Sequence, residues 1–283
     1  MSGRGPSTTR LARGWERTQS VLLEGTGRQI LDQATGAGRG VMLFADVLGQ
    51  LGQLGRCRAT LLRQLASAGF GSLLILSLIA GLTGMIMSMQ TGAALEPYGV
   101  IDQLGAIIAI TFCRELGPIW AAVIVLARVG ASMAAELGTM VVNEEVDALR
   151  CMSIDPVRYL VLPRVVALVL AMPILAAVAD LVGILGGGLV ASSVFGLPMG
   201  AYLEAARTAL QPIDFFSGLF KAAVFGVIIA VVACARGLAT SDGAEGVGRA
   251  TTSSVVLNVL FVLIADLVLT WLIKVAAVPA FQP

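Results

Sequence analysis

The most informative absence in this sequence is histidine, which occurs at none of its 283 positions. Without an imidazole, a chain has no Ser-His-Asp triad, no histidine general base and no histidine metal ligand. Charge is also scarce, since 13% of the residues are Asp, Glu, Lys or Arg, against about 25% in an ordinary soluble domain. These shortages exclude histidine-dependent catalysis and argue against a soluble globular protein.

Two motifs are missing as well. The four cysteines form no CxxC pair and lie mostly in or beside apolar runs, so buried thiols are expected rather than a disulfide framework. No GxxxxGK[ST] sequence occurs, and the glycine-rich "SDGAEGVG" at 241–248 lacks the lysine of a phosphate-binding loop. If ATP powers this protein, another subunit must therefore bind the nucleotide.

Apolar sequence is abundant: 57% of the residues are hydrophobic and the mean hydropathy is +0.88. Residues 64–95 contain no ionisable side chain, although a membrane span needs only about 20 apolar residues. Because only helices or closed barrels satisfy the backbone in lipid, runs of this length predict transmembrane helices. We expect five of them, at roughly 67–95, 103–131, 160–195, 214–236 and 251–277.

More polar segments divide the rest of the chain. The sequence predicts an Arg- and Gly-rich arm over 1–39, an amphipathic interfacial helix over 40–66, a transmembrane domain over 67–277 and a short tail over 278–283. A short connecting helix packed on protein explains 40–66 nearly as well. Most arginines lie in the arm and in segments 134–163 and 236–249. The positive-inside rule therefore places the N-terminus in the cytoplasm, and five spans place the C-terminus outside.

The densest charge stands in "ELGTMVVNEEVDALRCMSIDP", residues 136–156, between the second and third predicted spans. Apolar residues there recur at spacings of four and three, which predicts a short amphipathic helix over about 136–153. This helix either docks into a groove of a cytoplasmic ATPase or is a solvated connection, and the spacing does not decide between them. Its candidate contact residues are Glu136, Val142, Glu144, Glu145, Val146, Asp147, Leu149 and Met152.

Charges also occur inside the spans. Arg114 and Glu115 interrupt the second span, where an arginine costs about 2.5 to 3.5 kcal/mol on insertion scales. They either line a substrate cavity or pair with a neighbouring helix. Asp180, Lys221 and Asp266 stand singly in other spans. If the acidic residues relayed protons, the chain would be an ion-coupled secondary transporter; an intramembrane enzyme and an assembly scaffold are further alternatives.

Two long blocks resemble the MlaE/YrbE-type permeases, the membrane subunits of ABC transporters that work with MCE-domain proteins in lipid trafficking. They are "RELGPIWAAVIVLARVGASMAAELGTMVVNEEVDALRCMSIDPVRYLVLPRVVA" (114–167) and "GVGRATTSSVVLNVLFVLIADLVLT" (246–270). The resemblance covers roughly residues 40–277. It implies the MlaE-type permease fold: an all-α integral membrane protein of the bacterial inner membrane, with an N-terminal interfacial helix and five transmembrane helices.

The resemblance also implies partners. The permease would be a homodimer with two MlaF-like ATPase subunits, which hold ATP and Mg, and a hexameric MlaD-like MCE ring on the outer side. The chain itself would bind no cofactor, metal or nucleic acid and would have no catalytic residue. Its cargo would be a lipid, phospholipid in the first place, although the sequence gives neither the lipid nor the direction. By position, the lipid cavity would involve Leu82, Met85, Met89, Gln90, Tyr98, Arg114 and Glu115.

Overall fold

The computed structural model describes residue 38, residues 42–47, residues 49–50 and residues 58–277. The arm predicted over 1–39 and the tail over 278–283 lie outside the described residues, apart from Gly38. Within the described part, every regular element is a helix. This agrees with the all-α prediction.

Five helical segments among the described residues are long and apolar enough to cross a membrane. They are Leu61–Tyr98, Ile101–Val142, Val157–Val194, Pro212–Leu238 and Gly243–Val275. The prediction of five spans is confirmed. The second span is longer than predicted, because it continues eleven residues past position 131 and ends at Val142.

The second span is a series of α-helical pieces joined by two wider π-helical turns. It comprises α3 (Leu104–Thr111), η4 (Phe112–Leu116), α4 (Gly117–Val125), η5 (Leu126–Gly130) and α5 (Ala131–Val142). Single π turns within α-helices are often found at functional sites. Here each π turn carries an arginine, Arg114 in η4 and Arg128 in η5.

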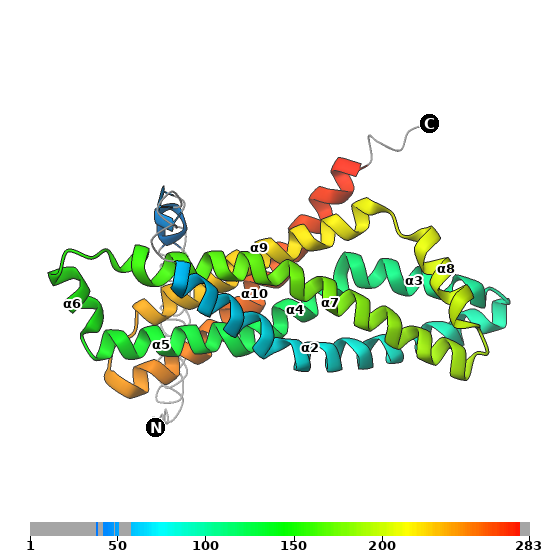
Figure 1. Ribbon diagram of the computed structural model, residues 1–283, viewed down its shortest axis with the longest axis horizontal. Coiled ribbons are helices and arrows are strands. Elements are labelled where there is room, and N and C mark those ends of the chain that lie inside the picture. Colours follow the sequence, from blue (N-terminus) through cyan, green and yellow to red (C-terminus); the bar gives the residue numbers. More distant parts are fainter. Residues whose placement is uncertain (1–37, 39–41, 48, 51–57, 278–283) are drawn as a thin grey trace, which may run out of the picture.

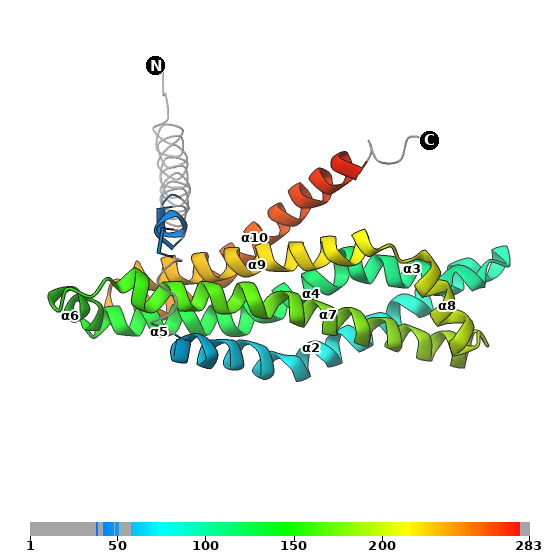
Figure 2. The same cartoon turned by 45° about the horizontal axis from the view of Figure 1, so that its top comes forward.

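The spans form one elongated bundle (Figures 1 and 2). Helix α7 (Leu162–Val194) packs along both α2 (Arg58–Leu95) and α9 (Pro212–Leu238), and it continues through Pro173, where the sequence predicted a kinked or broken helix. Helix α10 (Gly243–Ala277) packs on α9 and α5, and its last turns diverge from the bundle. Helices α6 (Glu145–Cys151) and α8 (Met199–Ala209) lie at opposite ends (Figure 1).

Glycines allow α2 and α7 to pack closely. A Cβ atom added to Gly84 would overlap the backbone carbonyl of Gly183, and one added to Gly186 would press on the carbonyl of Gly81. Small residues permit such close approach between membrane helices. The outer surfaces of α2 and α10 stay apolar and exposed in this chain; examples are Phe70, Leu74, Leu267 and Trp271.

The predicted boundary between an interfacial helix and the first span is absent from the structure. Helix α2 begins at Arg58 and runs without a break past position 66, because the stretch contains no proline to interrupt its hydrogen bonds. Of the preceding segment, residues 42–47 are helical. Val47 is buried there, and the Gln50 side-chain amide donates a 2.6 Å hydrogen bond to Asp155. This segment contacts protein, as the alternative of a packed connecting helix requires.

Candidate functional site

The charges inside the spans gather around one lysine of α9. The Lys221 ammonium lies 2.8 Å from a Glu115 carboxylate oxygen and 3.0 Å from one of Asp266. It also donates hydrogen bonds to the Thr270 hydroxyl, at 2.7 Å, and to the Arg114 carbonyl oxygen, at 3.1 Å. Its side chain is 3% exposed. One buried cation therefore joins the second, fourth and fifth spans.

A second ion pair lies beside it. Two nitrogens of the Arg114 guanidinium each lie 2.7 Å from Asp214 Oδ1. The other oxygen of Asp214 accepts a 3.2 Å hydrogen bond from the backbone N–H of Gln211, within a capping box that begins α9. Asp214 was not predicted as a site residue, because only its position at the first turn of α9 aims it at η4. We call Arg114, Glu115, Asp214, Lys221 and Asp266 the Lys221 ion cluster.

The Lys221 ion cluster realises the second of the two arrangements predicted for Arg114 and Glu115, pairing with neighbouring helices. Both residues also line a small cavity of about 110 Å³ between η4, α9 and α10. Asp180 is separate: it is buried against Gly117, and among the described residues no hydrogen bond links it to the cluster. The three acids proposed as a proton relay therefore do not form one connected chain.

The remaining lipid-cavity candidates lie elsewhere. Leu82, Met89, Gln90 and Tyr98 are exposed on the part of α2 and η2 (Glu96–Tyr98) that approaches the α8 end, and Met85 is half-buried. The cavity beside Arg114 is lined by η4, α9 and α10 and not by α2. A single chain therefore does not bring the two halves of the predicted lipid cavity together, and that role stays a prediction.

The structure divides the helix predicted over 136–153. Helix α5 ends at Val142, and α6 begins only at Glu145, because Glu144 adopts a left-handed backbone conformation with φ of 59°. That conformation is unfavourable for residues other than glycine and breaks the helix. The Glu144 N–H bonds to the Val141 carbonyl across the turn. The segment is therefore a seven-residue helix at the tip of the bundle, after a turn (Figure 1).

The apolar side of α6 faces the chain itself. Val146 is buried and Leu149 packs against the core, whereas Val142 and Met152 are exposed. The exposed side is acidic and consists of Glu144, Glu145 and Asp147, the last of which pairs with Arg150 at 3.0 Å. Glu136 lies apart in α5. A partner at this end would meet charge more than an apolar ridge, and the docking role of these residues stays a prediction.

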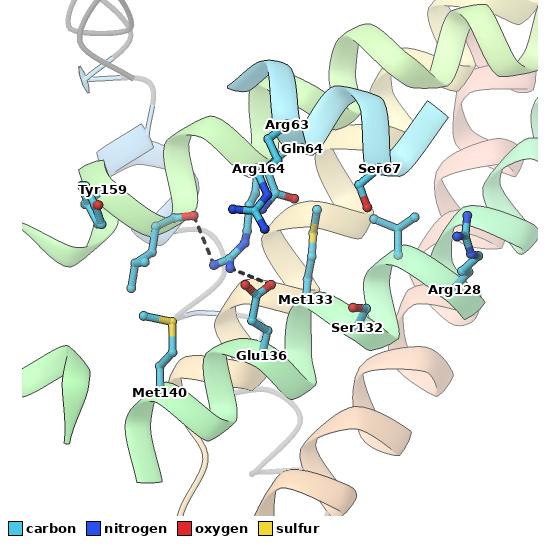
Figure 3. Close-up of a pocket in the computed structure, with 12 residues that line it drawn as sticks. Arg63, Gln64, Ser67, Arg128, Ser132, Met133, Glu136, Met140, Tyr159 and Arg164 are labelled. Carbon is cyan, nitrogen blue, oxygen red and sulfur yellow. Dashed lines mark hydrogen bonds and ion pairs between the residues drawn. The ribbon is translucent and has the colours of Figure 1, made fainter. Parts of the chain in front are cut away.

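Sequence reasoning missed a second polar site. A cavity of about 560 Å³ lies near the α6 end and is lined by arginines from three elements (Figure 3). These are Arg63 on α2, Arg128 on η5 and Arg164 on α7, together with Glu136; we call these four residues the arginine cavity. Arg128 and Arg164 lie inside predicted apolar spans. An ionisable residue within a span is a signal of function by default, so the sequence did carry a sign of this site.

Comparison with known proteins places this architecture in a family. The sequence matches the family described as "Permease MlaE" over residues 61–272. A probable ABC transporter permease protein of Rickettsia prowazekii is 41% identical over 210 residues, which cover 74% of this chain and 81% of that protein. A probable ABC transporter permease protein of Synechocystis is 40% identical over 215 residues, which cover 76% and 82%.

A plant protein is also similar. The chloroplastic protein TRIGALACTOSYLDIACYLGLYCEROL 1 of Arabidopsis thaliana is 39% identical over 209 residues, which cover 74% of this chain and 60% of the plant protein. The family match includes all five spans, from the first turns of α2 almost to the end of α10. The chain therefore belongs to the MlaE permease family and is a multi-pass, non-catalytic membrane subunit of an ABC transporter.

Proposed function

We propose that this permease moves lipid, with phospholipid as the first candidate, between the bacterial inner membrane and an MCE-domain protein, driven by a separate ATPase. The observation that carries the proposal is the match to the MlaE family across all five spans. A similar protein is named after a galactosylated diacylglycerol, which favours a lipid cargo. An ABC permease has no need of the proton relay considered for a secondary transporter.

The ATPase docks at the α6 end. This end carries the exposed acids Glu144, Glu145 and Asp147 on a short helix that connects the second and third spans. Because Val146 and Leu149 anchor α6 to its own bundle, a push on this helix is transmitted to the ends of α5 and α7. The positive-inside rule makes the α6 end cytoplasmic and the α8 end, where the MCE protein binds, the outer end.

The lipid cavity forms between two copies of the chain. Helix α10 and the outer half of α2 expose apolar side chains such as Leu82, Ile86, Met89 and Leu267. Within one chain, these candidates stand apart from Arg114 and Glu115. A homodimer that covers both faces buries this apolar surface. It also encloses a space between the copies, apolar on its α2 walls, in which acyl chains are held.

The docking step is tested by reversing charge on α6. We expect the double substitution Glu145→Lys/Asp147→Lys to abolish co-purification of the ATPase, because both side chains are exposed and acidic. Arg207→Gln is the matched control, since Arg207 is exposed on α8 at the opposite end. Unchanged ATPase binding by the double variant would show that the motor docks elsewhere.

The transport step is tested in proteoliposomes that contain the permease and its ATPase, with the MCE-domain protein as acceptor or donor. We expect labelled phospholipid to move between membrane and MCE protein only when ATP is hydrolysed. Mass spectrometry of lipid bound to the purified complex identifies the cargo. Stimulated ATP hydrolysis without any lipid movement would refute lipid transport while leaving the ABC subunit assignment intact.

A further inference from the structure

The arginine cavity lies between the first turns of α2, the π turn η5 with α5, and the start of α7. Its volume of about 560 Å³ falls within the range of roughly 300 to 1,000 Å³ found for small-molecule sites. Figure 3 shows Glu136 and Arg164 pointing toward one another, with Arg63 and Gln64 on α2 and Arg128 farther along the second span. Ser67, Ser132 and Tyr159 add hydroxyl groups to the lining.

The charges of this cavity do not balance. Three guanidinium groups face one carboxylate, that of Glu136, which lies 2.9 Å from an Arg164 nitrogen. Arg128 reaches only the Ser72 hydroxyl, at 3.3 Å. Among the described residues, neither Arg63 nor Arg128 has a carboxylate partner. Because an uncompensated cation is costly in a membrane, the excess of positive charge indicates an anionic ligand.

One donor in the cavity is buried without a partner. The Arg164 side chain is 4% exposed, and its Nε–H makes no hydrogen bond, although the two terminal nitrogens bond to the Leu160 carbonyl and to Glu136. Buried side-chain donors in native proteins usually have a partner. An acceptor inside the cavity would supply the missing one.

The backbone leaves room for Arg128. A Cβ atom added to Gly71 on α2 would overlap the Arg128 guanidinium, so glycine at this position lets the side chain lie against α2 beside Ser72. Arg128 itself belongs to the π turn η5. It lies eight residues before Glu136, which is about 12 Å along the helix axis. The cavity therefore extends well into the span from the level of Glu136.

The cavity borders the surface of α2 that faces lipid. Arg63, Gln64 and Ser67 line it, whereas Leu62, Phe70 and Leu74 are exposed, the last two to 80%. Because successive helical residues are rotated by about 100°, these two stripes are neighbours on the helix surface. Met133, Met140 and Leu160 add apolar walls. A molecule with an anionic head and apolar chains matches this combination.

We propose that the arginine cavity binds the phosphate group of a phospholipid from the membrane leaflet at the α6 end. The planar guanidinium groups of Arg63 and Arg128 donate paired hydrogen bonds to phosphate oxygens, and Arg164 Nε supplies a further donor. The acyl chains lie along the apolar stripe of α2. Inorganic phosphate offers the same oxygens, but it makes no use of the apolar walls or of a site that borders lipid. The site requires only that the chain spans a membrane, and it is independent of the transport reaction proposed above.

Binding is tested by native mass spectrometry of the delipidated full-length chain in detergent. Three probes are added separately: dioleoylphosphatidylglycerol, dioleoylglycerol, which has the same chains without phosphate, and inorganic phosphate. We expect Arg63→Gln/Arg128→Gln to weaken phosphatidylglycerol binding about tenfold or more, because hydrogen bonds to charged groups are lost. The matched control is Arg158→Gln, which removes an arginine from the same end of the bundle but outside the cavity lining.

Each outcome is decisive. Phosphatidylglycerol binding that falls in the double variant but not in Arg158→Gln, with dioleoylglycerol binding unchanged, supports the site. Equal phosphatidylglycerol binding by the double variant and the wild type overturns it, as does an equal loss of dioleoylglycerol. Displacement of phosphatidylglycerol by an equal concentration of inorganic phosphate overturns the lipid as the source of the phosphate group.

A second measurement applies if the double variant does not fold. Gly71→Ala keeps every charge but displaces the Arg128 guanidinium, and we expect it to weaken phosphatidylglycerol binding by a smaller factor. In membranes, p-benzoylphenylalanine placed at Tyr159 should cross-link phospholipid, and Gly71→Ala should reduce this product. The same label at Phe220, exposed on α9, should be insensitive to Gly71→Ala. Cross-linking at Tyr159 that Gly71→Ala leaves unchanged contradicts the site.

Discussion

The Lys221 ion cluster and the arginine cavity start from the same device and end in opposite states. Each contains an arginine held in a π turn of the second span, Arg114 in η4 and Arg128 in η5. In the Lys221 ion cluster, three carboxylates from α9, α10 and η4 surround two cations. In the arginine cavity, one carboxylate faces three cations. Charge compensated by neighbouring helices holds the spans together, whereas charge left in excess is available to a ligand.

The largest effect should come from removing the cation that the Lys221 ion cluster shares. Lys221→Met leaves Glu115 and Asp266 facing each other without a counter-ion, and breaking a buried ion pair costs about 3 to 5 kcal/mol. We expect the free energy of unfolding, measured in mixed micelles with increasing denaturing detergent, to fall by about this amount. A variant as stable as the wild type would remove the structural half of the comparison.

A smaller effect should follow from removing one carboxylate of the same cluster. Asp214→Asn leaves the Arg114 guanidinium without its anion, and the hydrogen bonds to a charged group that are lost contribute about 1.5 kcal/mol. Arg114 is half-exposed, so water replaces part of the interaction and the loss should stay below that of Lys221→Met. The same detergent titration measures it. A loss larger than that of Lys221→Met would show that Asp214, and not Lys221, is the centre of the cluster.

The arginine cavity should respond differently to losing its carboxylate. The Glu136 side chain is 55% exposed, so Glu136→Gln should lower the free energy of unfolding by about 1 kcal/mol or less. The same change removes the only carboxylate that lines the cavity. Phosphatidylglycerol binding should therefore become tighter, as measured by native mass spectrometry. Weaker binding would indicate that Glu136 positions Arg164 for the ligand, which would sharpen the comparison in another direction.

The smallest effect is expected at the edge of the Lys221 ion cluster. Lys274 lines the small cavity beside Arg114, but among the described residues it forms no ion pair. It is also exposed, so Lys274→Gln should change stability by less than about 0.5 kcal/mol. Thermal denaturation of the purified variant is a sufficient measurement. A loss similar to that of Asp214→Asn would show that the cluster extends to Lys274.

Much of the fold followed from the sequence, because uncharged runs of this length have one main solution in a bilayer. The number of spans and the separate location of the acidic segment were predictable in this way. The boundary at 66/67 was not, since the apolar pattern changes there while the helix continues through Arg58–Leu95. The break at Glu144 was also missed, because its left-handed conformation is adopted by a residue that gives no such signal.

The candidate site was predicted in part. Arg114 and Glu115 were recognised because they stand together in an apolar run, yet their partners Asp214, Lys221 and Asp266 are about 100 to 150 residues away in sequence, and only packing brings them near. The arginine cavity was missed because Arg63, Arg128 and Arg164 come from three elements. Spacing within one segment reveals one face of one helix and cannot show which faces meet.

The two π turns of the second span have a consequence for how the chain tolerates length changes. Each π turn holds one residue more than an α-helical turn, so deleting a single residue within Leu126–Gly130 would restore a regular helix and rotate everything beyond it by about 100°. Glu136 would then turn away from Arg164, and α6 would leave its place at the tip. The angular registration between the two ends of the molecule is thus encoded by single residues in the interior of one helix.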